Sequence, residues 1–167
     1  MSLLQLARAY TIFTNEGQLL PLTLLKRDAQ PIGKRLISRE TAFEVNRMME
    51  MAVMPGGTAP RAQVPGYRVA GKTGTAHKAE NGGYAEHKYV SSFVGFGPVT
   101  RPRFIVAVML DEPQGAKYYG GDVGAPVFSS VMGAALRMMS VAPDAPGAPA
   151  AAPGTINVQA PRERDEG

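Results

Sequence analysis

The sequence predicts an α+β fold, an α/β sandwich in which an antiparallel sheet is flanked by helices. Two strand-like segments, residues 89–98 and 103–110, are separated only by a turn at residues 100–102, and so short a connection forces antiparallel pairing. Segments 38–53 and 126–139 instead carry apolar residues at the spacing of a helix. The 103–110 strand is apolar on both faces, so other parts of the fold must cover both.

Composition limits the class of protein and the kinds of partner. The chain has 167 residues, which suits one domain, and 44% of them are hydrophobic while 19% are charged. No apolar run approaches the ~20 residues of a membrane span. The net charge is +4, yet the basic residues are scattered, so we expect no nucleic-acid partner. The absence of cysteine excludes disulfides and thiolate metal sites.

The first half of the chain is expected to supply two helices and little sheet. Residues 2–15 have helical spacing, with Ser2 as a possible cap and Gly17 suited to end the helix. Pro21 interrupts the apolar run that follows, so we expect short edge strands and loop over residues 18–37. A second helix begins at Ser38 or Thr41. Its expected buried side is made of Phe43, Val45, Met48, Met49, Ala52 and Val53.

The second half is expected to supply the sheet and a last helix. A break at residues 55–60 leads into a central strand, residues 69–76, followed by a polar hairpin loop at residues 77–84. A glycine- and tyrosine-rich loop spans residues 115–121, and Pro126 begins the last helix. The side of that helix expected to be buried comprises Val127, Phe128, Val131, Met132, Ala135, Leu136 and Met139. Residues 1–142 thus form one domain, and the Pro/Ala-rich residues 143–167 are expected to be a disordered tail.

The two histidines give no sign of a metal centre. His77 and His87 flank a polar segment and have no Asp or Glu at metal-ligand spacing, whereas a zinc site needs three or four ligands. We therefore assign both to the hairpin loop. The sequence predicts neither a metal nor another cofactor.

The central strand carries the residues with the strongest chemical signal. Side chains alternate along a strand, so Thr73 and Thr75 share one face, roughly 7 Å apart, and Lys72 shares the other with Gly74. Two hydroxyls on one face suit a small anion, and the ammonium of Lys72 favours a carboxylate. Gly74 carries no side chain, which lets a ligand backbone pair with the strand edge.

A nucleotide-binding interpretation competes with this strand. Residues 66–73 satisfy the phosphate-loop pattern G-x-x-x-x-G-K-[ST], and residues 106–112 imitate the acidic strand end that holds Mg²⁺ in such enzymes. The mechanism requires a strand before the loop and a helix directly after Thr73. Pro65 precedes the motif and glycine-rich polar residues follow it, so we disfavour this alternative.

Five motifs occur in the order and approximate spacing of one protein family. Residues 2–140 resemble the C-terminal part of the transpeptidase domain of class B penicillin-binding proteins, and the closest likeness is to the septal, cell-division type of Gram-negative bacteria. The resemblance implies a fragment of the serine β-lactamase/D,D-peptidase-like fold. The motifs are Gln5-Leu6-Ala7-Arg8-Ala9-Tyr10 with Asn15-Glu16-Gly17, Gly56-Gly57-Thr58, Gly71-Lys72-Thr73-Gly74-Thr75-Ala76, Phe93-Val94-Gly95-Phe96 and Tyr118-Tyr119-Gly120-Gly121.

The resemblance also implies an activity and a role for each site residue. The parent protein would be a peptidoglycan D,D-transpeptidase that binds D-Ala-D-Ala stem peptides and β-lactams. Lys72 would polarise the family's middle-motif serine, and Thr73 and Thr75 would bind the terminal carboxylate. The backbone N–H of Thr75 would serve the oxyanion hole, while Tyr118 and Tyr119 would form a wall near the bound side chain.

The same resemblance places the parent in the inner membrane, with this domain facing the periplasm and division proteins as partners. The chain contains no Ser-x-x-Lys and no Ser-x-Asn, so we expect a fragment whose nucleophile lies outside it and which is inactive alone. Residues 103–111 would then be an uncovered sheet edge. His77 stands where many relatives carry Arg or Lys. A non-catalytic sensor or scaffold with the same fold is the remaining alternative.

Overall fold

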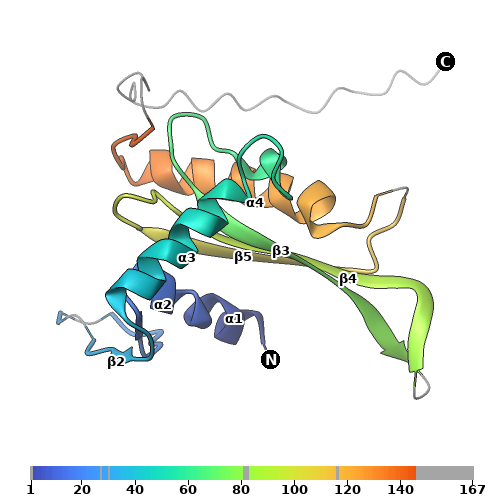
Figure 1. The fold of residues 1–167 in the computed structure, drawn as a ribbon, viewed down its shortest axis with the longest axis horizontal. Coiled ribbons are helices and arrows are strands. Elements are labelled where there is room, and N and C mark those ends of the chain that lie inside the picture. The colour runs from blue at the N-terminus through green and yellow to red at the C-terminus, as the bar shows by residue number, and fades with distance from the viewer. Residues whose placement is uncertain (1, 27, 30, 81–82, 116, 146–167) are drawn as a thin grey trace.

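The computed structural model describes residues 2–26, 28–29, 31–80, 83–115 and 117–145, and it is built around a three-stranded antiparallel sheet (Figure 1). The strand order is β3-β4-β5, and the turn after Gly97 brings β5 back antiparallel to β4 as predicted. A second sheet has two short antiparallel strands, one before Pro21 and the other after Pro31. The strands are β1 (Gln18–Leu19), β2 (Lys34–Arg35), β3 (Ala70–Glu80), β4 (Gly83–Gly97) and β5 (Phe104–Asp111).

Helices cover both faces of the sheet, which confirms the α+β prediction (Figure 1). On one face, the fully buried Phe93 of β4 packs against Phe128 of α4, with ring centroids 4.8 Å apart. On the other face, Phe96 and Ala70 meet Met49 of α3. The helices are α1 (Leu3–Ala9), α2 (Thr11–Thr14), α3 (Arg39–Met51) and α4 (Gly120–Met138), with a 3-10 turn η1 (Pro60–Ala62) beside α4.

Helix starts follow local side-chain chemistry. Ser2 caps α1 through a capping box with Gln5, and Ser38 caps α3 by accepting a hydrogen bond from the Thr41 N–H. The predicted helix over residues 2–15 is instead two short helices that meet at Tyr10. Gly17 ends this segment with a φ of 89°, a value that favours glycine.

The hairpin between β3 and β4 is longer than the sequence indicated. Both strands continue through the segment assigned to a polar loop, so His77 lies in β3 and His87 in β4. The resulting arm extends beyond the helices (Figure 1). The pairing shifts register between His77 and Ala79, and there Lys78 bonds Glu112 at 2.7 Å and Asp111 at 3.0 Å. These contacts tie β3 to the end of β5 across β4, a link that the sequence pattern did not indicate.

Two predicted core faces need correction. On α3, Phe43 is 61% exposed and Met48 is 64% exposed, so the methionines of this helix do not all fill the core. On α4, the buried ridge is Gly124, Phe128, Met132 and Leu136, whereas Val127, Val131 and Met139 are exposed. In both helices the buried stripe is narrower than the apolar pattern, because only one side meets the sheet.

Helix α4 begins at Gly120, six residues before the predicted start at Pro126. The tyrosine- and glycine-rich loop therefore ends at Tyr119, the helix N-cap. At the other end of the chain, the Asp144 carboxylate accepts hydrogen bonds from Arg68 N–H and the Thr100 hydroxyl. The body thus includes Asp144, which the sequence assigned to the tail, and residues 146–167 lie outside the described residues.

The backbone is incompatible with a phosphate loop. Residues 70–80 form a continuous strand in which Thr73 pairs with Phe93, and no helix follows Lys72. A helix N-terminus directly after the lysine is what cradles phosphates in that motif. The nucleotide-binding alternative is therefore wrong. Within the described part of the chain, no helix is long and apolar enough to cross a membrane.

Candidate active site

A cleft lies between β3 and the N-terminus of α4. Its volume is about 380 Å³. The Thr73 and Thr75 side chains both line it, as strand alternation requires of residues two apart. The remaining lining residues come from the segment before β3 and from the start of α4: Thr58, Pro60, Arg61, Tyr119, Gly120, Gly121 and Asp122.

Both threonine hydroxyls already accept a hydrogen bond from the protein. The Gly120 N–H donates to Thr75 Oγ1 at 3.2 Å, and Lys72 Nζ donates to Thr73 Oγ1 at 3.3 Å. A hydroxyl has one proton to donate, so each threonine keeps its own proton for a ligand in the cleft. Such a pair of donors suits an anion.

Lys72 does not line the cleft, but its ammonium, which comes from the opposite face of the sheet, bonds Thr73 at the edge of the cleft. Its ammonium bends around the free edge of β3 and also donates to the Thr73 carbonyl at 3.0 Å. That carbonyl therefore points away from β4, and the backbone groups of Thr75, two residues on, point the same way. In the described residues β3 has β4 as its only neighbouring strand, so this edge is open to an added peptide strand.

Glycines allow α4 to approach the sheet closely at the cleft. A Cβ on Gly120 would lie 2.7 Å from the Gly74 carbonyl oxygen and closer still to the Ser92 carbonyl oxygen. A Cβ on Gly74 would collide with Ser92 Oγ. A larger residue at position 120 would push α4 away from the sheet and break the contact between Gly120 and Thr75, whereas one at position 74 would first displace the Ser92 hydroxyl.

Aromatic rings form one wall beside the cleft. Tyr118 stacks on Tyr89 with centroids 4.1 Å apart, and its hydroxyl bonds that of Tyr119 at 3.1 Å. This bond raises the pKa of Tyr119 above its usual value of 10.0. The buried Ser91 hydroxyl donates to the Tyr118 carbonyl and ties the wall to β4. The rings of His77 and Tyr89 have centroids 4.6 Å apart, so the exposed His77 extends the wall along β3.

The structure adds residues that the sequence analysis did not select. Arg61 and Asp122 line the cleft, and Arg61 NH1 donates to the Asp122 carbonyl at 2.7 Å. Thr58 was noted only as part of the Gly56-Gly57-Thr58 motif. The glycines of Tyr118-Tyr119-Gly120-Gly121 were the one available signal, because adjacent glycines often mark a close backbone approach. Among the described residues, no group of three potential metal ligands occurs.

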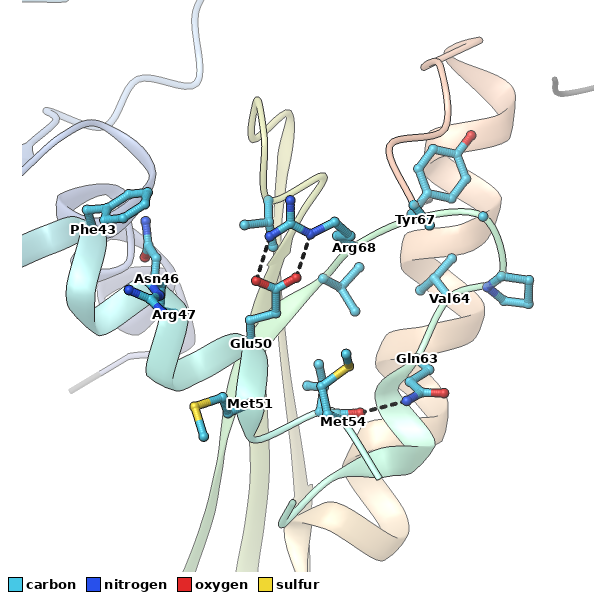
Figure 2. A pocket seen from close by; sticks show the side chains of 16 residues that line it. Phe43, Asn46, Arg47, Glu50, Met51, Met54, Gln63, Val64, Tyr67 and Arg68 are labelled. Atoms are coloured by element: carbon cyan, nitrogen blue, oxygen red, sulfur yellow. Dashed lines mark hydrogen bonds and ion pairs between the residues drawn. The ribbon is translucent and has the colours of Figure 1, made fainter. Parts of the chain in front are cut away.

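A larger groove lies elsewhere on the molecule. It has a volume of about 890 Å³ and runs between α3 and residues 63–69 (Figure 2). Phe43, Met51 and Met54 give it an apolar rim, and Glu50 and Arg68 cross it as a paired carboxylate and guanidinium (Figure 2). None of the residues with predicted site roles lines this groove.

Comparisons with known proteins agree on one family. The model of the penicillin binding protein transpeptidase domain matches residues 1–133. The probable peptidoglycan D,D-transpeptidase PenA of Neisseria gonorrhoeae is 48% identical over 146 residues, 87% of this chain and 25% of that protein. The peptidoglycan D,D-transpeptidase FtsI of Escherichia coli is 42% identical over 142 residues, 85% of this chain and 24% of FtsI.

A solved structure shows the same fold. The TP domain of penicillin-binding protein 3 from Burkholderia pseudomallei superposes with a TM-score of 0.81 and 49% identity, covering 87% of this chain and 45% of that one. The chain spans about a quarter of the length of the curated relatives it matches.

Proposed function

The chain belongs to the penicillin binding protein transpeptidase domain family, and on that premise we propose that it forms the substrate-carboxylate side of a peptidoglycan D,D-transpeptidase. The observation that carries the proposal is the cleft itself. Thr73 and Thr75 face it together, and each hydroxyl accepts one hydrogen bond from the protein and keeps its own proton to donate. A stem peptide ending in D-Ala-D-Ala presents a carboxylate that such donors bind.

The proposed reaction uses a serine from outside this chain. The serine oxygen attacks the carbonyl between the two D-alanines, its bond to that carbon forms, and the C–N bond to the terminal D-alanine breaks. The released D-alanine takes up the proton at its amine. An amine of a neighbouring stem peptide then attacks the ester and returns the serine hydroxyl, which leaves a cross-link.

Each predicted site residue has a role in this proposal. Lys72 polarises the serine, and the Thr75 N–H, which points to the open edge of β3, donates to the developing oxyanion. The substrate backbone lies along β3 at Gly74, where no side chain blocks it. Tyr118 and Tyr119 form the wall that contacts the substrate side chain.

We further propose that the whole protein acts in cell division and is acylated by β-lactams. Its relatives include proteins named FtsI and PenA, and its motifs resemble the septal type. In this proposal the parent is anchored in the inner membrane, and the domain faces the periplasm, where division proteins bind it. The sensor or scaffold alternative would keep the fold and lack acylation.

Labelling with a fluorescent penicillin tests this function. The whole protein, extended upstream to include a Ser-x-x-Lys segment, should be labelled, and this chain alone should not. Lys72→Ala should reduce the labelling rate by about 100-fold or more, because the serine loses its polarising partner. Lys34→Ala, which removes an exposed lysine of β2, is the matched control and should label normally. A folded whole protein that never labels would favour the sensor or scaffold.

A further inference from the structure

Arg61 places a second kind of cation in the cleft. It lies in η1, lines the cleft together with Thr73 and Thr75, and is exposed. Within the described part of the chain, no carboxylate lies within ion-pair distance of its guanidinium. A guanidinium has five N–H donors, and the contact that holds Arg61 uses NH1 on a neutral carbonyl.

A proline fixes the position of this arginine. In a helix, the N–H of residue 126 would bond the carbonyl of residue 122, but Pro126 has no N–H. The Asp122 carbonyl is left without its helical partner and accepts from Arg61 NH1 at 2.7 Å instead. The helix therefore holds the guanidinium at the mouth of the cleft without neutralising its charge.

The charges around the cleft favour an anion. Arg61, Lys72 and Lys117 are cations, and the Asp122 carboxylate is paired with Lys117 at 3.5 Å. Arg61 thus remains available as a planar, bidentate partner for a carboxylate. His77, which shares the cleft face of β3, does not line the cleft and has its ring against that of Tyr89.

We propose that Arg61 is a specificity-determining residue that recognises the substrate carboxylate together with Thr73 and Thr75, and that Pro126 positions it through the Asp122 carbonyl. This inference rests on the proposed transpeptidase function. It assigns the electrostatic part of carboxylate recognition to η1, outside the β3 motif.

The test compares a penicillin with its methyl ester, which lacks the carboxylate charge. Both compounds compete with a fluorescent penicillin for the whole protein, and the acylation rate of each is measured. Arg61→Ala should slow acylation by benzylpenicillin roughly 10- to 100-fold, the effect of losing a charge-assisted hydrogen bond. It should leave the rate with the methyl ester unchanged, and Arg61→Lys should recover part of the lost rate.

A matched control and a second variant separate recognition from structure. Arg101→Ala removes an exposed arginine from the β4–β5 turn, at the far end of the sheet, and should change neither rate. Pro126→Ala restores an N–H that competes for the Asp122 carbonyl. It should lower the benzylpenicillin rate several-fold while keeping the ester rate, without removing any charge.

The outcomes are distinct. If Arg61→Ala slows both compounds equally, or slows neither, while wild-type protein labels normally, the inference is overturned and the proposed function stands. If wild-type protein labels with neither compound, the proposed function fails and takes this inference with it.

Discussion

The cleft at β3 and the groove beside α3 differ in a way that size does not reveal. The groove is more than twice as large, at about 890 Å³ against about 380 Å³, yet the Glu50 and Arg68 that cross it satisfy one another. Arg68 donates to both carboxylate oxygens of Glu50 at 2.7 and 2.8 Å. In the cleft, the threonine hydroxyls and Arg61 keep donors for a ligand. Hydrogen-bond donors that remain available to a ligand are therefore a better guide to this site than cavity volume.

The largest expected effect comes from adding a side chain at Gly120, where α4 lies closest to the sheet beside the cleft. Gly120→Ala should destabilise the protein by about 2 kcal/mol, because its Cβ meets two carbonyl oxygens. It should also slow acylation, since α4 must move away from Thr75. Urea denaturation and penicillin labelling measure the two effects.

Gly133→Ala is the matched control for that substitution. It lies in the same helix, and its Cβ meets first the flexible end of Arg137, at 3.1 Å. Stability and labelling should both be preserved. Equal losses in the two variants would mean that the close approach at Gly120 has no special importance.

A smaller effect is expected in the groove. Glu50→Gln should cost about 1 kcal/mol of unfolding free energy, because a half-buried, bidentate pair loses its charge. Labelling should be unchanged, since the groove has no catalytic role in our proposal. Glu44→Gln, which disrupts an exposed pair with Arg47 at 3.7 Å, should cost less than about 0.5 kcal/mol. If the Glu50→Gln variant were labelled more slowly, the groove would also affect acylation, and the distinction drawn between the cleft and the groove would be wrong.

The smallest effect is a pH dependence that distinguishes the ion pair of Arg68 in the groove from that of Lys78, which lies in β3 beyond the cleft. Hydrogen bonds to Glu112 and then Asp111 raise the pKa of Lys78 above its usual value of 10.5, and the hydrogen bond to Glu50 raises the already high pKa of Arg68 further. A raised folded-state pKa gives stability that is complete below the unfolded value and is lost as pH rises through the folded one. Of these two cations, only Lys78 loses its proton at an alkaline pH that a denaturation experiment can reach.

Urea denaturation from pH 8 upward checks this for Lys78. The wild-type advantage over Lys78→Gln should be constant below about pH 10 and should shrink above the raised pKa of Lys78. The Arg68 pair should contribute equally throughout. A gap between wild type and Lys78→Gln that stays constant to strongly alkaline pH would contradict the prediction.

Much of the fold could be predicted because local patterns and tertiary packing agree there. The 100–102 turn fixed the pairing of β4 with β5, and Ser38 marked the start of α3. The early start of α4 could not be foreseen, because Gly120, Gly121 and an internal Pro126 all oppose a helix locally. Packing against the carbonyls of Gly74 and Ser92 overrides that preference.

The site was predictable only where strand geometry decides it. Thr73 and Thr75 face the same cleft because side chains alternate. Arg61 lies in a proline-rich crossing with no periodic pattern, so nothing in the sequence linked it to residue 122. The exposed Phe43 and Met48 were misassigned because helical spacing shows an apolar face without showing what covers it. The roles of the site residues stay predictions.

The contacts of Lys78 also anchor the hairpin arm at its register shift. Three contacts join the Lys78 ammonium to the carboxylates of Asp111 and Glu112, so β3 is tied to the end of β5 across the intervening strand. Beyond this anchor, Tyr84 is 80% exposed. We expect a force applied to the outer arm to be resisted at Lys78, three residues before it would reach Thr75.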